Sequence, residues 1–312
     1  MSVIIRARDI TKTFGREIKA VDGLSFTVEE GQVYGFLGQN GAGKSTTIRM
    51  LLTLITPGSG DIEIFGMNLP RNRKTILRRT GAIIERPDLY KYLTALENLR
   101  IFAKMSGLNL TDKVLMEHLA KIGLADRAHS KVKTYSQGMK QRLGIAAALV
   151  HNPDLIILDE PTNGLDPQGI ADVRKLILHL SKDLKKTLLV SSHLLGEMEM
   201  IADSMLIIDK GKKIVEGPTA ELLNPEKILV EIVTDNKEKA IAVLRTTKWS
   251  GSLSDATNGN IMVELHKANI PDLNSELVSN GVRIFSLRPK HSLEDYFLSL
   301  TTANQHVAAR PN

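Results

Sequence analysis

A glycine-rich stretch near the N-terminus limits what this chain can fold into more than any other feature. Residues 38–46 read GQNGAGKST and fit the pattern G-x-x-x-x-G-K-[ST]. The apolar run at 32–37 predicts a strand before this loop, and the apolar spacing at 45–55 predicts a helix after it. A strand, a glycine loop and a helix in this order favour polyphosphate binding, because backbone N–H groups and the helix N-terminus point at the anion.

The residue types in the loop indicate how a nucleotide is held. Lys44 is expected to reach the β- and γ-phosphates, and the Ser45 hydroxyl is expected to bind Mg²⁺. The glycines allow the backbone to turn its N–H groups inward. The predicted nucleotide-binding residues of the loop are Gly38, Asn40, Gly41, Ala42, Gly43, Lys44, Ser45 and Thr46.

The composition excludes several other chemistries. The chain of 312 residues has no cysteine, so it has no disulfide framework, zinc–thiolate site or thiol catalysis. Charged residues begin at Arg6, which leaves no apolar signal core, and no apolar run approaches the roughly 18 residues that span a bilayer. We therefore expect a soluble chain, and the absence of cysteine fits a reducing cytosol.

The net charge of +6 is unevenly distributed, and its densest basic run lies at 71–79. A solvated helix face is the simplest interpretation, and attraction to anionic lipid at a membrane surface is the alternative. Nucleic acid is less favoured, because aromatic residues make up only 4% of the chain. The run consists of Arg71, Arg73, Lys74, Arg78 and Arg79.

Strands and helices alternate through residues 1–222 and predict an α/β domain. Residues 88–150 are predicted to form an inserted helical subdomain, whose first helix starts with a capping box of Thr94 and Glu97. Beyond this insertion, the apolar run at 155–158 is typical of a strand buried on both faces.

Residues 226–302 differ in pattern and predict a second, small α+β domain. The expected order β-α-β-β-α-β is typical of a ferredoxin-like sandwich. A last helix is expected at 292–300, and residues 303–312 are expected to form a flexible tail.

Two carboxylates, Asp159 and Glu160, follow the apolar run at 155–158. Ligands of open α/β sheets bind at the carboxyl ends of the strands. Asp159 is expected to hold Mg²⁺ through water, and Glu160 is expected to polarise the attacking water. Such a pair alone is common in surface turns, but downstream of a phosphate loop it indicates nucleotide hydrolysis.

Three further segments complete an order of motifs that resembles the ATP-binding cassette (ABC) ATPases. Residues 135–142 read YSQGMKQR, residues 164–166 read GLD, and His193 follows the next predicted strand. In that family these segments are the signature motif, the D-loop and the switch histidine. The resemblance covers about residues 3–220. It implies a RecA-like P-loop ATPase core with an antiparallel β subdomain and the inserted helical subdomain.

The resemblance also implies cofactors and a partner. ATP and Mg²⁺ are the expected cofactors, and a second copy of the chain is the expected partner. In the family, two cassettes pack head to tail and ATP lies between the phosphate loop of one and the signature of the other. The catalytic residues implied are Glu160, His193 and Lys44, and the signature side is expected to contribute Ser136, Gly138, Gln141 and Asp166. Phe14 occupies the place of an adenine-stacking aromatic, with Val21 as a second adenine contact.

Two residues depart from the usual pattern of the family. Gln137 replaces a signature glycine, while Ser136 and Gly138 are kept. Glu85 stands where the family has a glutamine, and it is expected to act as a third metal ligand beside Ser45 and Asp159. Together with the segment TALENL at 94–99, it resembles the bacitracin-resistance and lantibiotic self-protection exporters.

The expected function is therefore the ATPase subunit of an exporter, peripheral on the cytoplasmic face of the membrane, with a separate permease of the ABC-2 type. Nucleic acid is not an expected partner. A soluble ABC ATPase that acts on nucleic acid or ribosomes is the alternative, although the chain has one cassette and no long heptad insertion. A GTPase is disfavoured because its nearest guanine-reading segment, NKEK at 236–239, lacks the aspartate.

Overall fold

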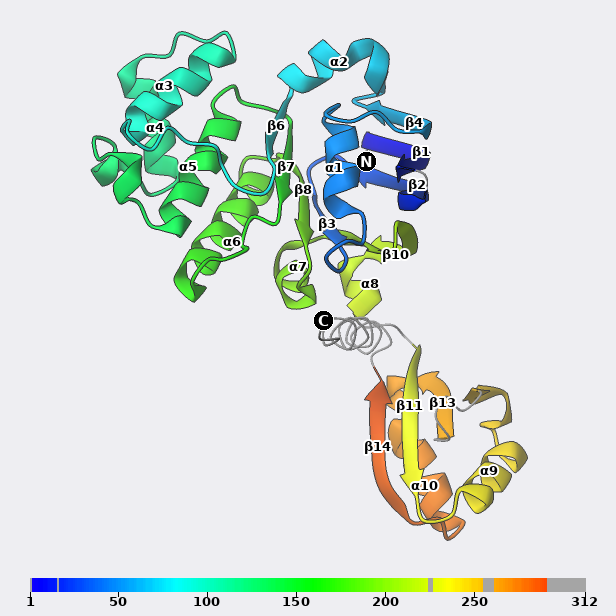
Figure 1. The fold of residues 1–312 in the computed structure, drawn as a ribbon. Helices are drawn as coiled ribbons and strands as arrows, with labels where there is room; N and C mark the ends of the chain where they lie inside the picture. Colours follow the sequence, from blue (N-terminus) through cyan, green and yellow to red (C-terminus); the bar gives the residue numbers. More distant parts are fainter. Residues whose placement is uncertain (1, 16, 224–226, 255–260, 291–312) are drawn as a thin grey trace, which may run out of the picture. The chain divides into compact units, whose positions relative to one another are not determined.

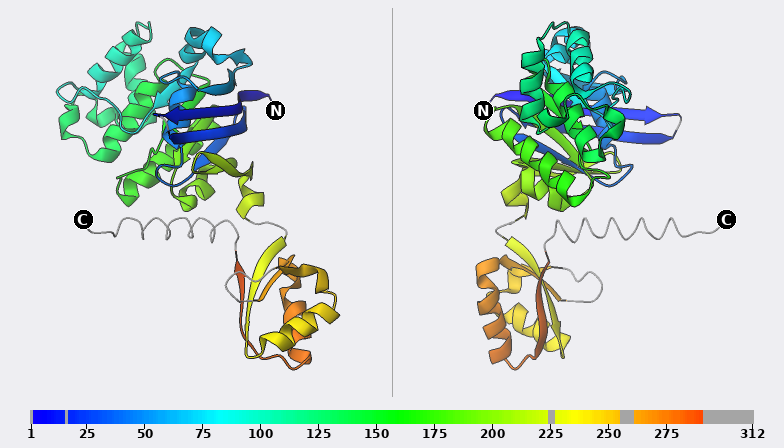
Figure 2. Two further views of the ribbon diagram at one scale, coloured as in Figure 1. Left: turned by 45° about the vertical axis from the view of Figure 1, so that its right-hand side comes forward. Right: turned by 90° about the vertical axis from the view of Figure 1, so that its left-hand side faces the viewer.

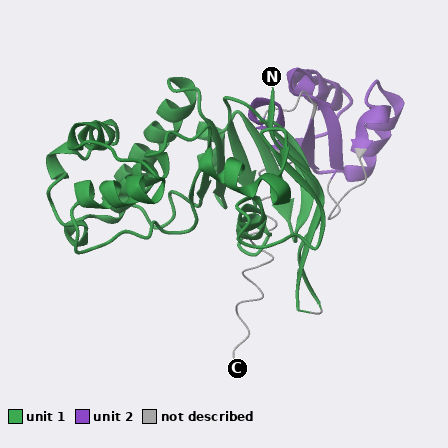
Figure 3. Ribbon diagram, turned by 90° about the horizontal axis from the view of Figure 1, so that it is seen from above, with its two compact units in different colours: residues 1–218 green, residues 219–312 purple. Residues whose placement is uncertain are grey.

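The computed structural model describes residues 2–15, 17–223, 227–254 and 261–290 (Figure 1). The chain divides into two compact units, residues 1–218 and 219–312 (Figure 3). The helix expected at 292–300 and the tail at 303–312 lie outside the described residues. Among the described residues, no helix is both long enough and apolar enough to cross a bilayer.

A six-stranded sheet forms the centre of the first unit, in the order β10-β9-β3-β8-β7-β6. All neighbours pair in parallel except β10 with β9. Every residue of β3, β7 and β8 is buried, which explains their continuous apolar sequences. The strands are β3 (Val33–Leu37), β6 (Thr80–Ile83), β7 (Leu155–Asp159), β8 (Thr187–Ser192), β9 (Ser204–Asp209) and β10 (Lys212–Pro218).

A second, antiparallel sheet packs against the central one, in the order β2-β1-β4-β5. Its strands are β1 (Val3–Phe14), β2 (Ile18–Glu29), β4 (Ser59–Ile64) and β5 (Met67–Asn68). The ring of Phe26 lies 6.1 Å from that of Tyr34 and 5.7 Å from that of Phe36, so aromatic side chains join the two layers. Helix α1 (Lys44–Leu51) contacts both β7 and β2.

Three helices form the lobe that the sequence predicts between β6 and β7 (Figure 2). They are α3 (Ala95–Met105), α4 (Asp112–Lys121) and α5 (Gln137–Leu149). The capping box before α3 is confirmed: the Thr94 N–H donates to Glu97 Oε2 at 2.7 Å, and the Glu97 N–H donates to Thr94 Oγ1 at 3.2 Å. The Thr94 backbone N–H and the Thr94 hydroxyl both donate to the Glu97 carboxylate, and these two hydrogen bonds lower the pKa of Glu97 below its usual value.

Three further helices belong to the first unit, and a short helix begins the second. They are α2 (Leu69–Arg78), α6 (Pro167–Lys182), α7 (Leu195–Ile201) and α8 (Thr219–Leu223). The basic run lies on α2 and at its end, and all five of its side chains are exposed. The sequence analysis did not predict α7, because seven residues are too few for a helical period to be visible.

The second unit contains a four-stranded antiparallel sheet in the order β12-β13-β11-β14. Its elements are β11 (Lys227–Thr234), α9 (Lys237–Thr246), β12 (Leu253–Ser254), β13 (Ile261–His266), α10 (Ile270–Ser279) and β14 (Ile284–Lys290). Side chains alternate between buried and accessible along β13, so one face of the sheet is covered. Leu244 of α9 and Leu273 of α10 belong to the same buried cluster as Val230 of β11.

Candidate active site

The glycine loop leaves the centre of the main sheet at the carboxyl end of β3. Leu37 pairs with Ser192 of β8, and the Gly38 N–H donates to the Ser192 carbonyl at 3.3 Å. Gly43 has φ +107°, and a Cβ at this position would lie 2.5 Å from the Ala20 carbonyl oxygen. Only glycine therefore fits between the loop and β2. The loop turns directly into α1, which begins at Lys44.

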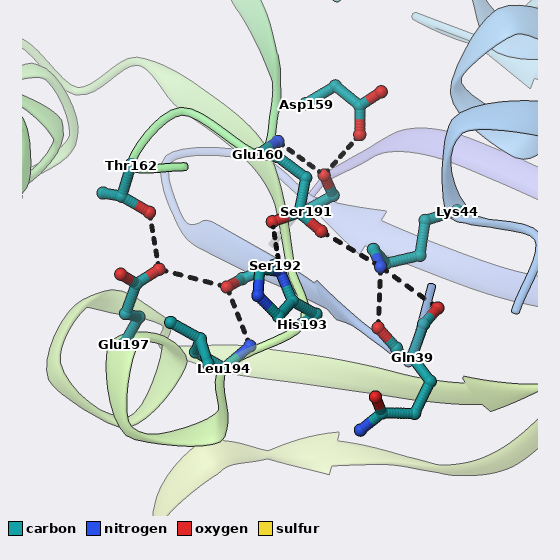
Figure 4. A network of polar contacts seen from close by, with 11 residues as sticks. Gln39, Lys44, Asp159, Glu160, Thr162, Ser191, Ser192, His193, Leu194 and Glu197 are labelled. Carbon is teal, nitrogen blue, oxygen red and sulfur yellow. Dashed lines mark hydrogen bonds and ion pairs between the residues drawn. The ribbon is translucent and has the colours of Figure 1, made fainter. Parts of the chain in front are cut away.

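Lys44 is buried, with 5% of its side chain exposed. Its Nζ donates to the carbonyl oxygen of Gly38 at 2.6 Å and to that of Gln39 at 3.3 Å (Figure 4). The same nitrogen lies 3.0 Å from Oε1 of Glu160. A buried charge requires such partners, and here the loop and Glu160 provide them.

Glu160 follows β7, and its carboxylate lies between Lys44 and His193. Its Oε2 lies 2.8 Å from Nδ1 of His193, and its Oε1 faces Lys44. Glu160 has φ +49°, in the left-handed region that a residue with a side chain seldom adopts. Strained backbone of this kind is concentrated at functional sites. The structure thus brings together the three residues that the sequence analysis named as catalytic.

Asp159 is buried beside Glu160 and is held by Ser191 of the neighbouring strand. The Ser191 hydroxyl donates to Asp159 Oδ1 at 2.6 Å and accepts from the Glu160 N–H at 2.9 Å. Asp159 and Ser191 are register partners in the parallel pair of β7 and β8. One serine therefore fixes both carboxylate residues at the edge of the sheet.

Sequence reasoning missed the side chains that tie the loops of this site together. Glu197 of α7 accepts from the Thr162 hydroxyl at 2.6 Å and from the Ser192 hydroxyl at 3.1 Å. The Leu194 N–H donates to the Ser192 hydroxyl at 3.0 Å. The loop after Glu160 is thus joined to the loop that carries His193. Two serines at the end of an apolar strand were the only local signal of this network.

The oxygen donors near Asp159 fit a magnesium ion in type. Asp159 Oδ2 is buried and has no hydrogen-bond partner in the described part of the chain. Ser45 lies half-buried at the start of α1 and adds a hydroxyl. Carboxylate and hydroxyl oxygens together with substrate phosphates are the donors that Mg²⁺ prefers. No group of three Asp, Glu or His side chains that could hold an ion alone is found among the described residues.

Glu85, the third expected metal ligand, forms an ion pair with an arginine in this structure. Its side chain is 64% exposed and pairs with Arg49 of α1 at 2.6 Å. In the described part of the chain, Glu85 thus pairs with Arg49 and forms no hydrogen bond or ion pair with Asp159 or Ser45. Like Glu160, Glu85 has a left-handed backbone, with φ +60°.

The two residues expected to contact adenine differ in solvent exposure. Phe14 is 43% exposed, and Lys12 Nζ lies 5.6 Å from the centre of its ring. Val21 is fully buried in the core of the antiparallel sheet and lies next to Gly43. Val21 has no exposed surface in this structure, and its side chain lies beside the glycine loop. Within the loop, Asn40 and Gly41 are exposed, Thr46 is half-buried, and Ala42 is buried.

The signature residues lie at the start of α5. The Met139 N–H donates to the exposed Ser136 hydroxyl at 3.2 Å, so Ser136 caps the helix. Gly138 packs closely on Gly169 of α6, where a Cβ would lie 3.4 Å from the Gly169 Cα. Gln141 is buried, and its Nε2 has no partner among the described residues. Asp166 caps α6 by accepting from the Gly169 N–H at 3.0 Å.

The signature residues and the Lys44 cluster are separate within the chain. Among the described residues, no hydrogen bond or ion pair joins Ser136, Gly138 or Gln141 to Lys44, Glu160 or His193. The chain therefore holds a cluster of Lys44, Glu160 and His193 and, apart from it, an exposed helix N-terminus at Ser136.

Comparisons with known proteins agree with this geometry. A profile of the family "ABC transporter" matches residues 21–163. The bacitracin transport ATP-binding protein BcrA of Bacillus licheniformis is 45% identical over 301 residues, which cover 96% of this chain and 98% of that protein. The lantibiotic transport ATP-binding protein SrtF of Streptococcus pyogenes is 39% identical, over 68% of this chain and 90% of its own.

A solved structure shows the same fold in a nucleotide-bound state. It is a dimeric ATP-binding cassette in a post-hydrolysis state with ADP and Pi, 25% identical, with a TM-score of 0.62 over 69% of this chain and 99% of that one. The sequence matches and the fold lead to one conclusion. The chain belongs to the ABC transporter family and is the ATP-binding, ATP-hydrolysing subunit of a bacterial exporter.

Proposed function

We propose that two copies of this chain close head to tail around two ATP molecules and so drive a separate permease of the ABC-2 type. The separation of the two halves of the site carries this proposal. Lys44, Glu160 and His193 meet at one place, whereas Ser136 stands exposed at the start of α5. An ATP held by Lys44 has its second face open, and Ser136 of another copy is the group that would cover it.

In the proposed site, ATP replaces Glu160 as the partner of Lys44. The loop N–H groups and the N-terminus of α1 surround the β- and γ-phosphates, and Lys44 turns from Glu160 to their oxygens. A triphosphate carries more negative charge than one carboxylate, so it is the stronger partner for the buried ammonium group. Across the interface, Ser136 and the N-terminus of α5 would donate to the γ-phosphate.

Ser45 and Asp159 would hold Mg²⁺, with Asp159 acting through a water molecule. The ion would neutralise charge on the β- and γ-phosphate oxygens. The unpartnered Oδ2 of Asp159 supports this assignment. Glu85 is a proposed additional ligand, which would first have to leave Arg49.

Once released from Lys44, Glu160 would orient the attacking water and accept its proton. Ser191 holds the Glu160 backbone, and His193 lies against the Glu160 carboxylate, so the side chain has a defined position before water enters. His193 would then contact the γ-phosphate from the same chain as Lys44. Phe14 is the proposed adenine contact, and its exposed ring supports this role.

A groove between the central sheet and the helical lobe is the proposed docking site for the permease. It has a volume of about 480 Å³ and lies between the segment 80–89 and α5, with Phe102 and Met105 of α3 on its wall. Gly144 packs so closely on Pro87 that a Cβ there would lie 2.3 Å from it. A short cytoplasmic helix of the permease would contact Pro87 in this groove. If Pro87 moves, Glu85 moves with it, and the movement would be transmitted to the nucleotide.

The cellular setting and the second unit are proposed on the same grounds. A subunit that docks on a permease would lie peripherally on the cytoplasmic face of the membrane. The relatives transport bacitracin and lantibiotics, so an antibiotic peptide is the proposed substrate class. We assign the second unit to the ferredoxin-like class, because its elements follow the order β-α-β-β-α-β around an antiparallel sheet.

Affinity purification of the tagged chain from detergent-solubilised membranes tests the proposed function. We expect a multi-span permease to be recovered with the wild-type chain. Leu89→Asp in the groove should lose the permease but keep ATP binding, and Lys113→Asp on the exposed side of α4 should keep both. Recovery of ribosomes or DNA in place of a permease would support the alternative of a soluble ABC ATPase.

A further inference from the structure

A second, basic cleft adjoins the proposed permease groove. It has a volume of about 790 Å³ and lies between α2 and the C-terminal end of α3. Three residues line both cavities: Met105, Ser106 and His151. The other described lining residues are Arg73, Lys74, Leu77, Arg78, Gly107 and Leu108, and none of them is acidic.

The cations of the cleft come from one face of α2. Arg73 and Leu77 are four residues apart, as are Lys74 and Arg78, so their side chains form adjacent rows on the helix. Ile76 on the opposite face is buried in the core. The helix therefore presents its charged face to the cleft.

These cations lack carboxylate partners among the described residues. Within the described ranges, Arg79 forms an ion pair with Asp154 at 2.7 Å, but Arg73, Lys74 and Arg78 form none. Arg73 has a neutral partner, because its Nε donates to the Thr53 hydroxyl at 2.6 Å. Lys74 and Arg78 are like charges at i and i+4, a spacing that destabilises a helix unless an anion lies nearby.

The cleft also carries apolar surface. Met105 is 72% exposed, and Leu77 and Leu108 lie on the same walls. A bilayer surface is flat and would meet protruding cations, whereas a cleft with cationic and apolar walls fits a peptide segment with acidic and apolar side chains. Because the cleft is continuous with the groove, the permease is the chain best placed to supply that segment.

We propose that the basic cleft binds an acidic segment of the permease, next to the helix that occupies the adjoining groove. This inference rests on the proposed docking of a permease and adds the chemistry of a second contact. Carboxylates of the permease would pair with Lys74 and Arg78, while apolar side chains would pack on Met105. The pair of contacts would fix the orientation of the permease segment relative to α2.

A zero-length cross-link tests the contact directly. Carbodiimide treatment of the assembled complex should join Lys74 Nζ to an Asp or Glu of the permease, and peptide mass spectrometry would identify the linked carboxylate. Lys74→Arg keeps the charge but should abolish this link. A photo-cross-linker at Leu89 reports on groove docking independently. Capture of the permease at Leu89 without any Lys74 link would overturn the cleft proposal alone, and failure at both positions would overturn the proposed function.

Charge reversal separates the cleft from a general surface effect. Lys74→Glu should weaken recovery of the permease about tenfold, with unchanged basal ATP hydrolysis. Arg71→Glu makes the same charge change on α2 outside the cleft lining and should leave recovery close to wild type. Equal losses in both variants would contradict the proposal. Binding of the permease-free chain to phosphatidylglycerol vesicles that depends on Lys74 would assign the cleft to lipid instead.

Discussion

The two proposed halves of the ATP site differ in how many of their polar groups find partners within this chain. All partners of the Lys44 ammonium group come from this chain: the loop carbonyls and Glu160 surround it, and His193 contacts the same Glu160 carboxylate. At the start of α5, Ser136 is exposed, and Gln141 keeps a buried amide without a partner in the described structure. This difference between the two regions is the basis of our proposal that the start of α5 acts on the ATP bound by a second copy.

This difference predicts distinct failures for the two halves. Changes around Lys44 should affect binding or chemistry within one chain. Changes at Ser136 should leave single-chain binding intact and act only when two chains meet. The expected effects below run from the largest to the smallest.

Replacing Glu160 by glutamine should have the largest effect. The amide cannot accept the proton of the attacking water, so we expect ATP hydrolysis to fall roughly 10²- to 10⁴-fold while ATP still binds. Steady-state phosphate release and nucleotide titration measure the two properties. Glu117→Gln, on the exposed surface of α4, is the matched control and should hydrolyse at the wild-type rate. A normal rate in Glu160→Gln would remove its proposed role.

Lys44→Ala should weaken nucleotide binding itself. Hydrogen bonds to charged groups contribute about 1.5–3 kcal/mol, so we expect about a 10- to 100-fold rise in the Kd for ATP. Isothermal titration calorimetry with ATP and with ADP measures this effect. ADP should also bind more weakly, because the ammonium group is expected to contact the β-phosphate as well. Unchanged affinity for both nucleotides would contradict the placement of Lys44 in the site.

Ser136→Ala should reduce hydrolysis by about tenfold, because one hydrogen bond to the γ-phosphate is lost across the interface. The Kd for ATP measured on dilute single chains should not change. Loss of the helix cap should also lower stability by about 1 kcal/mol, which thermal unfolding would detect. A weaker ATP affinity of the monomer would place Ser136 at the nucleotide of its own chain and break the comparison.

Glu85→Gln should have the smallest effect. Its ion pair with Arg49 is exposed, and pairs of this kind contribute about 0.2–1 kcal/mol, so we expect turnover to change by about fivefold or less. ATP affinity should remain unchanged. Arg49→Gln breaks the same pair from the other side and should shift turnover in a similar way. If Glu85→Gln has the kinetics and transport of the wild type, the glutamate at this position does not affect the mechanism.

The sequence predicted features whose signal is local. Thr94 and Glu97 are three residues apart, and their capping box forms as expected. The apolar run at 155–158 carries no polar side chain, and the strand is buried on both faces. The triad of Lys44, Glu160 and His193 was also predictable, because each residue belongs to a motif at the end of a parallel strand.

Features that depend on packing between distant segments were not predictable. Ser191 forms hydrogen bonds with Asp159 and Glu160 because the register of β7 and β8 places it beside Asp159. Glu197 lies on a helix too short to show a period. Val21 stays a predicted adenine contact, and the burial of its side chain in the antiparallel sheet was not visible in the sequence. Glu85 pairs with Arg49, which lies 36 residues before it in the chain, and no sequence pattern shows this contact.

The mass of Glu160→Gln in solution with ATP and Mg²⁺ tests the central claim most directly. Because ATP binds but is not consumed, light scattering should show a particle of twice the 34.4 kDa of one chain. The same variant with ADP, or with Ser136→Arg added, should remain at the mass of a single chain. If Glu160→Gln binds ATP and stays monomeric, or if the added Ser136→Arg leaves the dimer intact, the two halves of the site are not joined across two copies.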